Sequence, residues 1–305
     1  MTVGDLPAGE LRALLRAQRL SIRIGPFLVR LGSVMPAIQA ALATLYRAHE
    51  IDTSADGAHF VIRLDAPSVF RRVFRAQAQF TFDHRQPFIP LPAAMAAPML
   101  EAGLNWCIGT FAHQFLVIHS ATLERGGRAL LMPAPPGSGK STLCAALVAR
   151  GWRLLSDEFA LVDPATGLLA PVPRPVALKE GSIDVIATWA PDAFIGPSVV
   201  NNEGELVAYM RPPSASVLAS GLRCRAGWIV VPQYVAGAET TATPTTPARA
   251  VLHLADNSFN YNFHGRQGFE RLADIADQAP AVTLRYSRLD EGVDAVDRLT
   301  ESGAP

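Results

Sequence analysis

The sequence predicts an α/β fold with a mixed β-sheet, built around a glycine-rich loop and preceded by a smaller α+β region. A short apolar run, a glycine-rich turn and an Ala/Leu-rich segment follow one another within residues 129–150. Strands and helices after residue 114 follow no strict alternation, which favours a mixed sheet. A long apolar segment at 91–115 joins them to the preceding elements. We therefore predict an N-terminal region at 1–113 and a larger domain, which contains the glycine-rich loop, at 114–305.

Periodicity and turn residues predict the elements of the N-terminal region. Leucines recur on one side of 5–18, which is typical of an amphipathic helix. Pro36 is well placed in the first turn of a second helix, and Pro98 is expected to start or kink a third. The predicted helices are 5–18, 35–47 and 91–115, and the predicted strands are 21–31 (two short strands around Gly25-Pro26), 60–64 and 72–82.

The larger part is predicted to begin with two strands, 115–123 and 129–133, joined by a turn at 124–127. The loop and its helix follow, and Gly151 is expected to end that helix. The remaining predictions are strands at 152–156, 159–162, 226–231 and 282–286, helices at 247–256, 267–277 and 290–299, a turn at 163–167 and a loop at 236–246.

The segment from Ala134 to Thr142 has the residues of a phosphate cradle. In a strand–turn–helix unit that ends in Gly-Lys-Ser, backbone N–H groups and the positive end of the helix hold the phosphates of a nucleotide. Lys140 supplies a positive charge, and the Ser141 hydroxyl is placed to ligate Mg²⁺. The full pattern has Gly where this chain has Ala134. The predicted nucleotide-binding residues are Pro136, Gly137, Ser138, Gly139, Lys140, Ser141 and Thr142.

Composition narrows the class of partner. The chain has 305 residues, of which 49% are hydrophobic, and 27 Lys+Arg balance 27 Asp+Glu. This balance gives no electrostatic case for nucleic acid or an anionic membrane. Three well-separated cysteines are typical of free thiols in a reducing compartment, and no segment has the apolar length of a membrane span. We therefore predict a cytoplasmic protein.

Two successive acids, Asp157 and Glu158, end the strand that follows the loop's helix. We expect this strand to lie beside the loop and to bring both carboxylates to the terminal phosphate. One carboxylate could then accept the proton of an attacking hydroxyl while the other holds Mg²⁺. The alternative is an exposed turn in which Asp157 is only a cap. Arg174 and Lys179 could pair with phosphate, although ordinary surface cations are the default interpretation.

The stretch from His119 through Asp157-Glu158 resembles the catalytic core of the HPr kinase/phosphorylase family. In that family a strand with a His precedes the phosphate loop, and a helix ending in Arg-Gly leads to paired acids, as at 149–158 here. The resemblance implies a P-loop kinase core, with ATP and Mg²⁺ as cofactors. It implies that Asp157 is the base, that Lys140 and Ser141 hold phosphate and Mg²⁺, that Glu158 lies near the metal, and that His119 is a partner in catalysis.

The whole chain is similar to the HPr-kinase-related kinases. The runs that carry this likeness are 103–107, 173–179, 260–269 and 285–287. This group implies a ribosomally synthesised peptide as acceptor and a peptide-chaperone protein as a further partner. Thr142 stands where the parent family has Glu, and the N-terminal region does not resemble the parent's regulatory domain. Phosphorolysis and control by metabolites are therefore not expected of this chain. The parent family forms ring-like oligomers, so an oligomer is possible here.

Three functions follow as alternatives. The first is an ATP-dependent kinase acting on a serine-type hydroxyl of a peptide or small protein. The second is a kinase of a small molecule such as an amino acid or a sugar. The third is a nucleotide-dependent sensor, which would not need a base beside the phosphates. The polar and aromatic residues at 260–264 could line an acceptor pocket, but a loop is the favoured interpretation.

Overall fold

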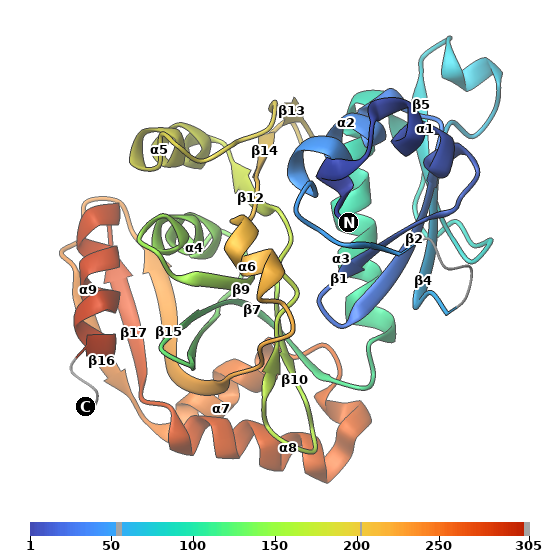
Figure 1. Ribbon diagram of the computed structural model, residues 1–305. Coiled ribbons are helices and arrows are strands. Elements are labelled where there is room, and N and C mark those ends of the chain that lie inside the picture. Colours follow the sequence, from blue (N-terminus) through green and yellow to red (C-terminus); the bar gives the residue numbers. More distant parts are fainter. Residues whose placement is uncertain (53–56, 202, 302–305) are drawn as a thin grey trace.

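Figure 1 shows the computed structural model of the chain as two groups of elements lying side by side. The structure describes residues 1–52, 57–201 and 203–301. One group is a sheet with its helices from the N-terminal part of the chain, and the other is a larger sheet with helices on both faces. The predicted mixed α/β architecture is confirmed.

The N-terminal sheet has the strand order β3-β1-β2-β4-β5-β6. Strands β2 and β4 are parallel, and the other pairs are antiparallel. Strand β4 reads as a half-buried strand, because Phe60, Ile62 and Leu64 face the core and alternate with less buried residues. The elements are η1 (Val3–Asp5), α1 (Ala8–Arg16), β1 (Leu20–Ile24), β2 (Phe27–Ser33), α2 (Pro36–Leu45), β3 (Ile51–Asp52), β4 (Phe60–Asp65), η2 (Phe70–Arg72), β5 (Gln77–Phe82), β6 (Leu91–Pro92), η3 (Ala93–Met95) and α3 (Ala96–Phe111).

The core of this N-terminal sheet continues into the second group of elements. Val117, Phe159 and Val172 belong to the same buried apolar cluster as Ile22 and Phe80. The two groups therefore pack directly against each other.

The larger sheet has the order β11-β10-β7-β8-β15-β17-β16, and β9 also pairs with β7. Strands β8, β15 and β17 run parallel, while the other pairs are antiparallel. A small sheet, β12-β14-β13, lies beyond it. The strands are β7 (Leu116–Arg125), β8 (Arg128–Pro133), β9 (Arg153–Ser156), β10 (Phe159–Val162), β11 (Leu169–Ala170), β12 (Val176–Lys179), β13 (Val199–Val200), β14 (Leu206–Met210), β15 (Arg225–Tyr234), β16 (Thr241–Thr245) and β17 (Ala281–Tyr286).

Helices cover both faces of the larger sheet (Figure 1). Along β8, Leu130 and Met132 pack with α4 and α9, while Ala129 and Leu131 pack with α7 and α8. A strand buried on both faces reads as a continuous apolar run, as this one does. The helices of this part are α4 (Lys140–Ala149), α5 (Gly181–Trp189), α6 (Ser214–Leu218), α7 (Pro247–Asp256), α8 (Tyr261–Gln278) and α9 (Leu289–Glu301).

Several predicted bounds were wrong. The strand predicted at 72–82 begins only at Gln77, since the residues before it form η2 and a protruding turn. The loop predicted at 236–246 contains the edge strand β16, which gains its hydrogen bonds from β17. The last long helix before β17 starts at Tyr261 and bends at Gly265, whose φ of 55° breaks the helical geometry. The small sheet and α5 and α6 were not predicted.

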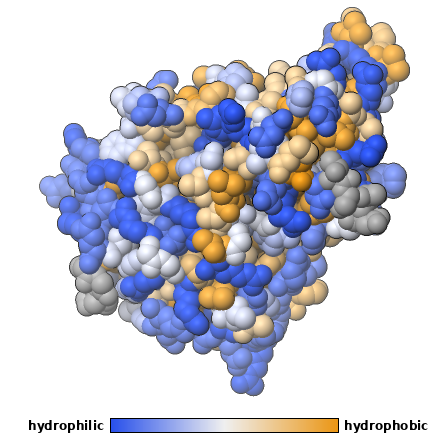
Figure 2. Space-filling model, viewed as in Figure 1, coloured by the Kyte–Doolittle hydropathy of each residue, from blue (hydrophilic) through white to orange (hydrophobic). Residues whose placement is uncertain are grey.

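The turn between β4 and β5 protrudes from the N-terminal sheet (Figure 1). Figure 2 shows apolar side chains at its tip, surrounded by polar surface. No helix among the described residues is long and apolar enough to span a membrane.

Candidate functional site

The glycine-rich loop, residues 134–139, leaves the end of β8 and opens α4. Gly137 and Gly139 have φ angles of 83° and 86°, a region that side-chain-bearing residues rarely adopt. The loop is held from two neighbouring strands. The Tyr234 N–H of β15 donates to Ser138 O (3.0 Å), and the Tyr286 hydroxyl of β17 donates to Gly139 O (3.2 Å). The loop geometry is thus fixed by the sheet as well as by its own sequence.

Gly139→Ala is expected to damage the loop more than Gly137→Ala. A Cβ on Gly139 would lie 2.6 Å from the Tyr286 hydroxyl oxygen, whereas a Cβ on Gly137 would meet nothing within 4 Å. Both substitutions carry the strain of a positive φ, so Gly137→Ala is a matched control for the clash. Nucleotide affinity measured by calorimetry should fall further in Gly139→Ala. Equal losses would show that the contact with Tyr286 does not matter.

Lys140 is the first residue of α4 and is buried. Its Nζ lies 2.6 Å from Nε2 of His119 on β7. Burial lowers the pKa of the ammonium, while the negative charges of Asp157 and Glu158 act in the opposite direction. The structure therefore brings the predicted lysine, histidine and both acids into one cluster.

Asp157 and Glu158 form the connection between β9 and β10, and both of these strands pair with β7. The expectation that β9 lies directly beside the loop's strand was wrong, because β7 lies between β9 and β8. Both outer strands are antiparallel to β7, so β9 and β8 run in the same direction. Their carboxyl ends therefore reach the same edge of the sheet, which is why the acids still arrive beside Lys140.

The Asp157 carboxylate is 4% exposed. Its Oδ2 accepts a hydrogen bond from the Ala177 N–H (3.1 Å), and Oδ1 has no hydrogen-bond partner among the described residues. Burial and the nearby charge of Glu158 raise the pKa of Asp157 to about 7, against the opposite effects of Lys140, the Ala177 N–H and the Ser141 hydroxyl. A buried carboxylate oxygen without a protein partner is costly for a fold, so Oδ1 is free to accept a hydrogen bond from water or a ligand.

This raised pKa predicts how stability depends on pH. The folded protein holds the Asp157 proton more tightly than the unfolded chain does. The contribution of Asp157 to the free energy of unfolding is therefore fully present below its ordinary pKa of 3.8. The contribution is lost as pH rises through about 7. Asp157→Asn should therefore raise the melting temperature by a few degrees at pH 8 and leave it nearly unchanged at pH 4, as measured by calorimetry. An equal shift at both pH values would contradict the raised pKa.

Glu158 faces His119. Its Oε2 lies 3.4 Å from His119 Nε2, and its main-chain carbonyl accepts a hydrogen bond from the Ser120 N–H (3.1 Å). Burial raises the pKa of Glu158, but the hydrogen bond with His119 and the positive charges of Lys140 and Arg174 outweigh it, so the pKa is lowered. The two neighbouring acids therefore differ in protonation: Glu158 is ionised at neutral pH, whereas Asp157 titrates near neutral pH.

This cluster suits a bound anion and a proton transfer. Backbone N–H groups, an ammonium and a helix N-terminus can hold phosphate, and a buried carboxylate with a pKa near neutrality can accept a proton. Within the described residues no group of three His, Cys, Asp or Glu side chains could hold a metal ion alone.

Arg174 and Lys179 make their ion pairs outside the cluster, although the charge of Arg174 still acts on Glu158. Arg174 is buried, and its guanidinium pairs with Glu101 on α3 (3.3 Å) and bonds Asn105. Tyr46 donates a hydrogen bond to the same Glu101 carboxylate (2.6 Å). The segment that leads into β12 is therefore linked through Arg174 to the N-terminal part. Lys179 is half-exposed on β12 and pairs with Glu205 (2.8 Å).

The polar side chains of residues 260–264 bond to the main chain of neighbouring elements. Asn260 is buried, accepts from the Val117 N–H (2.8 Å) and donates to Phe115 O (2.9 Å), so it ties the start of α8 to β7. His264 contacts the same Phe115 carbonyl (3.0 Å). The favoured loop interpretation was therefore wrong, because these residues begin a helix.

Sequence reasoning missed the residues that support the site from other elements. Tyr234 and Tyr286 hold the loop, Ala177 bonds Asp157, and Phe259 packs its ring 6.0 Å from that of His119. None of these contacts follows from local sequence, because each partner is at least 20 residues away. Only the aromatic character of 285–287, as part of a family likeness, pointed towards Tyr286.

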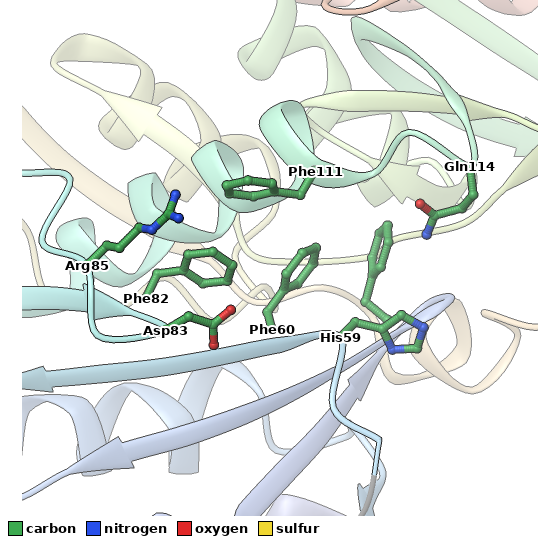
Figure 3. A pocket seen from close by; sticks show the side chains of 8 residues that line it. His59, Phe60, Phe82, Asp83, Arg85, Phe111 and Gln114 are labelled. Atoms are coloured by element: carbon green, nitrogen blue, oxygen red, sulfur yellow. The ribbon is translucent and has the colours of Figure 1, made fainter.

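A cavity of about 410 Å³ lies apart from this cluster, in the N-terminal sheet and the end of α3 (Figure 3). Figure 3 shows phenylalanine rings at its centre and polar side chains at its two ends. Its lining residues are Phe27, His59, Phe60, Phe82, Asp83, Arg85, Phe111 and Gln114. None of the predicted site residues contributes to it.

Comparison with protein families and with curated proteins finds no match. Among solved structures, the chain is similar to the HPr(Ser) kinase/phosphatase from Coxiella burnetii, with 13% sequence identity and a TM-score of 0.28. The match covers 61% of this chain and 99% of that one. A distant structural neighbour of this chain is thus a kinase. A likeness at this level assigns no function, which must be argued from the site itself.

Proposed function

We propose that this protein is an ATP-dependent kinase that transfers the γ-phosphoryl group to a serine-type hydroxyl of a peptide or small protein. One observation carries the proposal: the buried Asp157 is placed beside Lys140 at the start of α4, together with Glu158 and His119. A protein that only binds a nucleotide needs the lysine and the loop. It does not need a buried carboxylate with an unpartnered oxygen and a pKa of about 7.

The roles follow from position and protonation. The backbone N–H groups of the loop and Lys140 bind the β- and γ-phosphates, and the lysine neutralises charge that develops during transfer. Asp157 accepts the proton of the acceptor hydroxyl, because a pKa of about 7 lets the carboxylate hold that proton and release it near neutral pH. His119, in contact with both Lys140 and Glu158, positions these two charges.

The residues present also fit Mg²⁺. Ser141 and the ionised Glu158 would supply oxygen ligands, and a bound Mg²⁺ would neutralise negative charge on the phosphates. Asp157 is the acid that interacts with Ser141. Substitution of Asp157 by Asn therefore has to distinguish a base from a metal ligand.

The direct test is phosphorylation of an acceptor. Purified protein would be incubated with Mg-ATP and a serine-containing peptide library, and products would be analysed by mass spectrometry, with Lys140→Ala protein as the blank. Phosphopeptides that depend on Lys140 support the proposal. Transfer only to free amino acids or sugars would replace the acceptor class, and nucleotide binding without transfer to any acceptor would favour a sensor.

A further inference from the structure

A second site lies on the N-terminal sheet, independent of the nucleotide site. A cavity of about 370 Å³ opens between the end of α1, the start of α2 and the turn that protrudes between β4 and β5. Three arginines line it: Arg16, Arg71 and Arg72. Among the described residues, the rest of its wall is apolar apart from Gln77, and no acidic side chain lines it. We call this the arginine cavity.

The charge of the arginine cavity is not balanced by the described part of the chain. None of its three arginines forms an ion pair there. For Arg71 and Arg72 the nearest acid along the chain is Asp65, which already pairs with Arg63 (2.6 Å) and accepts a hydrogen bond from the Val34 N–H (2.7 Å). The whole chain carries equal numbers of acidic and basic residues. The excess of positive charge at the arginine cavity is therefore local and does not reflect a basic protein. Such an excess in a concave surface favours an anionic ligand.

Beside the cavity, the protruding turn exposes four large apolar side chains. They are Val69 (78% exposed), Phe70 (63%), Val73 (88%) and Phe74 (54%), and we call them the apolar tip. The ring centroids of Phe70 and Phe74 lie 5.0 Å apart, so the two rings form one continuous apolar surface. Figure 2 shows this tip standing out from the molecule. A group of apolar side chains exposed together, rather than scattered singly, marks an interaction surface.

We propose that the arginine cavity and the apolar tip form one docking site for an acidic amphipathic segment of a partner protein. Carboxylates of the segment pair with Arg16, Arg71 and Arg72, and its apolar side chains cover Val69, Phe70, Val73 and Phe74. The three guanidinium groups converge in a concave site that flexible carboxylate side chains of a peptide segment can reach. Bidentate pairing with guanidinium groups would fix the orientation of the segment.

The test uses a fluorescein-labelled helical peptide of Glu, Ala and Leu, with leucines on one face, and full-length protein. Anisotropy titration should give saturable binding that weakens with added salt. Arg71→Glu/Arg72→Glu should weaken it about tenfold or more, corresponding to about 1.4 kcal/mol. Val73→Ser/Phe74→Ser should also weaken it, since these side chains are exposed and their replacement does not disturb a core.

Two controls keep the result specific. Arg225→Glu/Arg249→Glu makes the same change of net charge at exposed positions of the larger sheet and α7, and should leave binding unchanged. Nucleotide affinity should be unaffected in every variant. No binding of the acidic peptide at about 1 mM, equal binding of a peptide with Lys in place of Glu, or equal loss in the control variant would each overturn the proposal. Binding of phosphatidylserine vesicles instead, lost in Arg71→Glu/Arg72→Glu, would reject the peptide in favour of a membrane.

Discussion

Lys140→Ala is expected to abolish phosphoryl transfer and to weaken nucleotide binding by about ten- to a hundredfold. The ammonium is buried at the start of α4, beside the loop that would hold the phosphates. A charge-assisted hydrogen bond in a partly desolvated site contributes about 1.5–3 kcal/mol, and each 1.4 kcal/mol is a factor of ten in affinity. Calorimetric titration with Mg-ATP measures the loss of binding, and release of labelled phosphate measures turnover.

The chain offers a matched control for this substitution, because Lys179 is its other lysine. Lys179 is half-exposed and pairs with Glu205, so Lys179→Ala removes the same group at a solvated position. It should leave nucleotide affinity within about twofold of the wild type. Unchanged binding in Lys140→Ala would overturn the assignment of the loop. A comparable loss of nucleotide affinity in Lys179→Ala would indicate that the phosphates bind near β12 instead.

Asp157→Asn is expected to retain nucleotide binding and to lower the rate of transfer by about 10²–10⁴-fold. Asparagine keeps an oxygen for the Ala177 N–H, so the loop between β9 and β10 should keep its shape. It cannot accept the proton of an acceptor hydroxyl. The measurement is kcat at saturating ATP and Mg²⁺, compared with the affinity for ATP in the same protein.

The neighbouring acid provides the comparison. Glu158→Gln should chiefly raise the Mg²⁺ concentration needed for half-maximal activity, because an ionised carboxylate is the better metal ligand. Should Asp157→Asn show that behaviour and recover its rate at high Mg²⁺, Asp157 is a metal ligand and the base must be sought elsewhere. Full activity in Asp157→Asn under all conditions would remove it from the mechanism.

The local parts of this structure were largely predictable. The apolar run at 129–133 and the following glycines predict a strand, a turn and a helix, and the structure has β8, the loop and α4 there. Helix α2 begins at Pro36, as its place in the first turn predicted, and Gly151 follows the end of α4 with a φ of 92°. These signals are read correctly because they depend on residues within a few positions of each other.

Predictions failed where a distant partner decides the outcome. Residues 241–245 have the composition of a loop but become β16, since β17 offers an unpaired edge. Arg174 has the character of a surface cation, yet it is buried because Glu101 and Tyr46, far away in sequence, supply its partners. Val73 and Phe74 lie in the segment 72–82 that was predicted as a strand, but no core lies against them.

The sequence alone determined which groups are present and on which local elements they lie: the glycines that permit the loop, the lysine at the start of α4, and two acids that end a strand. Only the tertiary structure decided what those groups do to one another. Insertion of β7 between β8 and β9 places His119 against Lys140 and Glu158. Packing from several elements then buries Asp157 and raises its pKa. The reason is physical: backbone conformation responds to neighbouring residues, whereas desolvation and charge–charge interactions depend on everything that folding brings within a few ångströms.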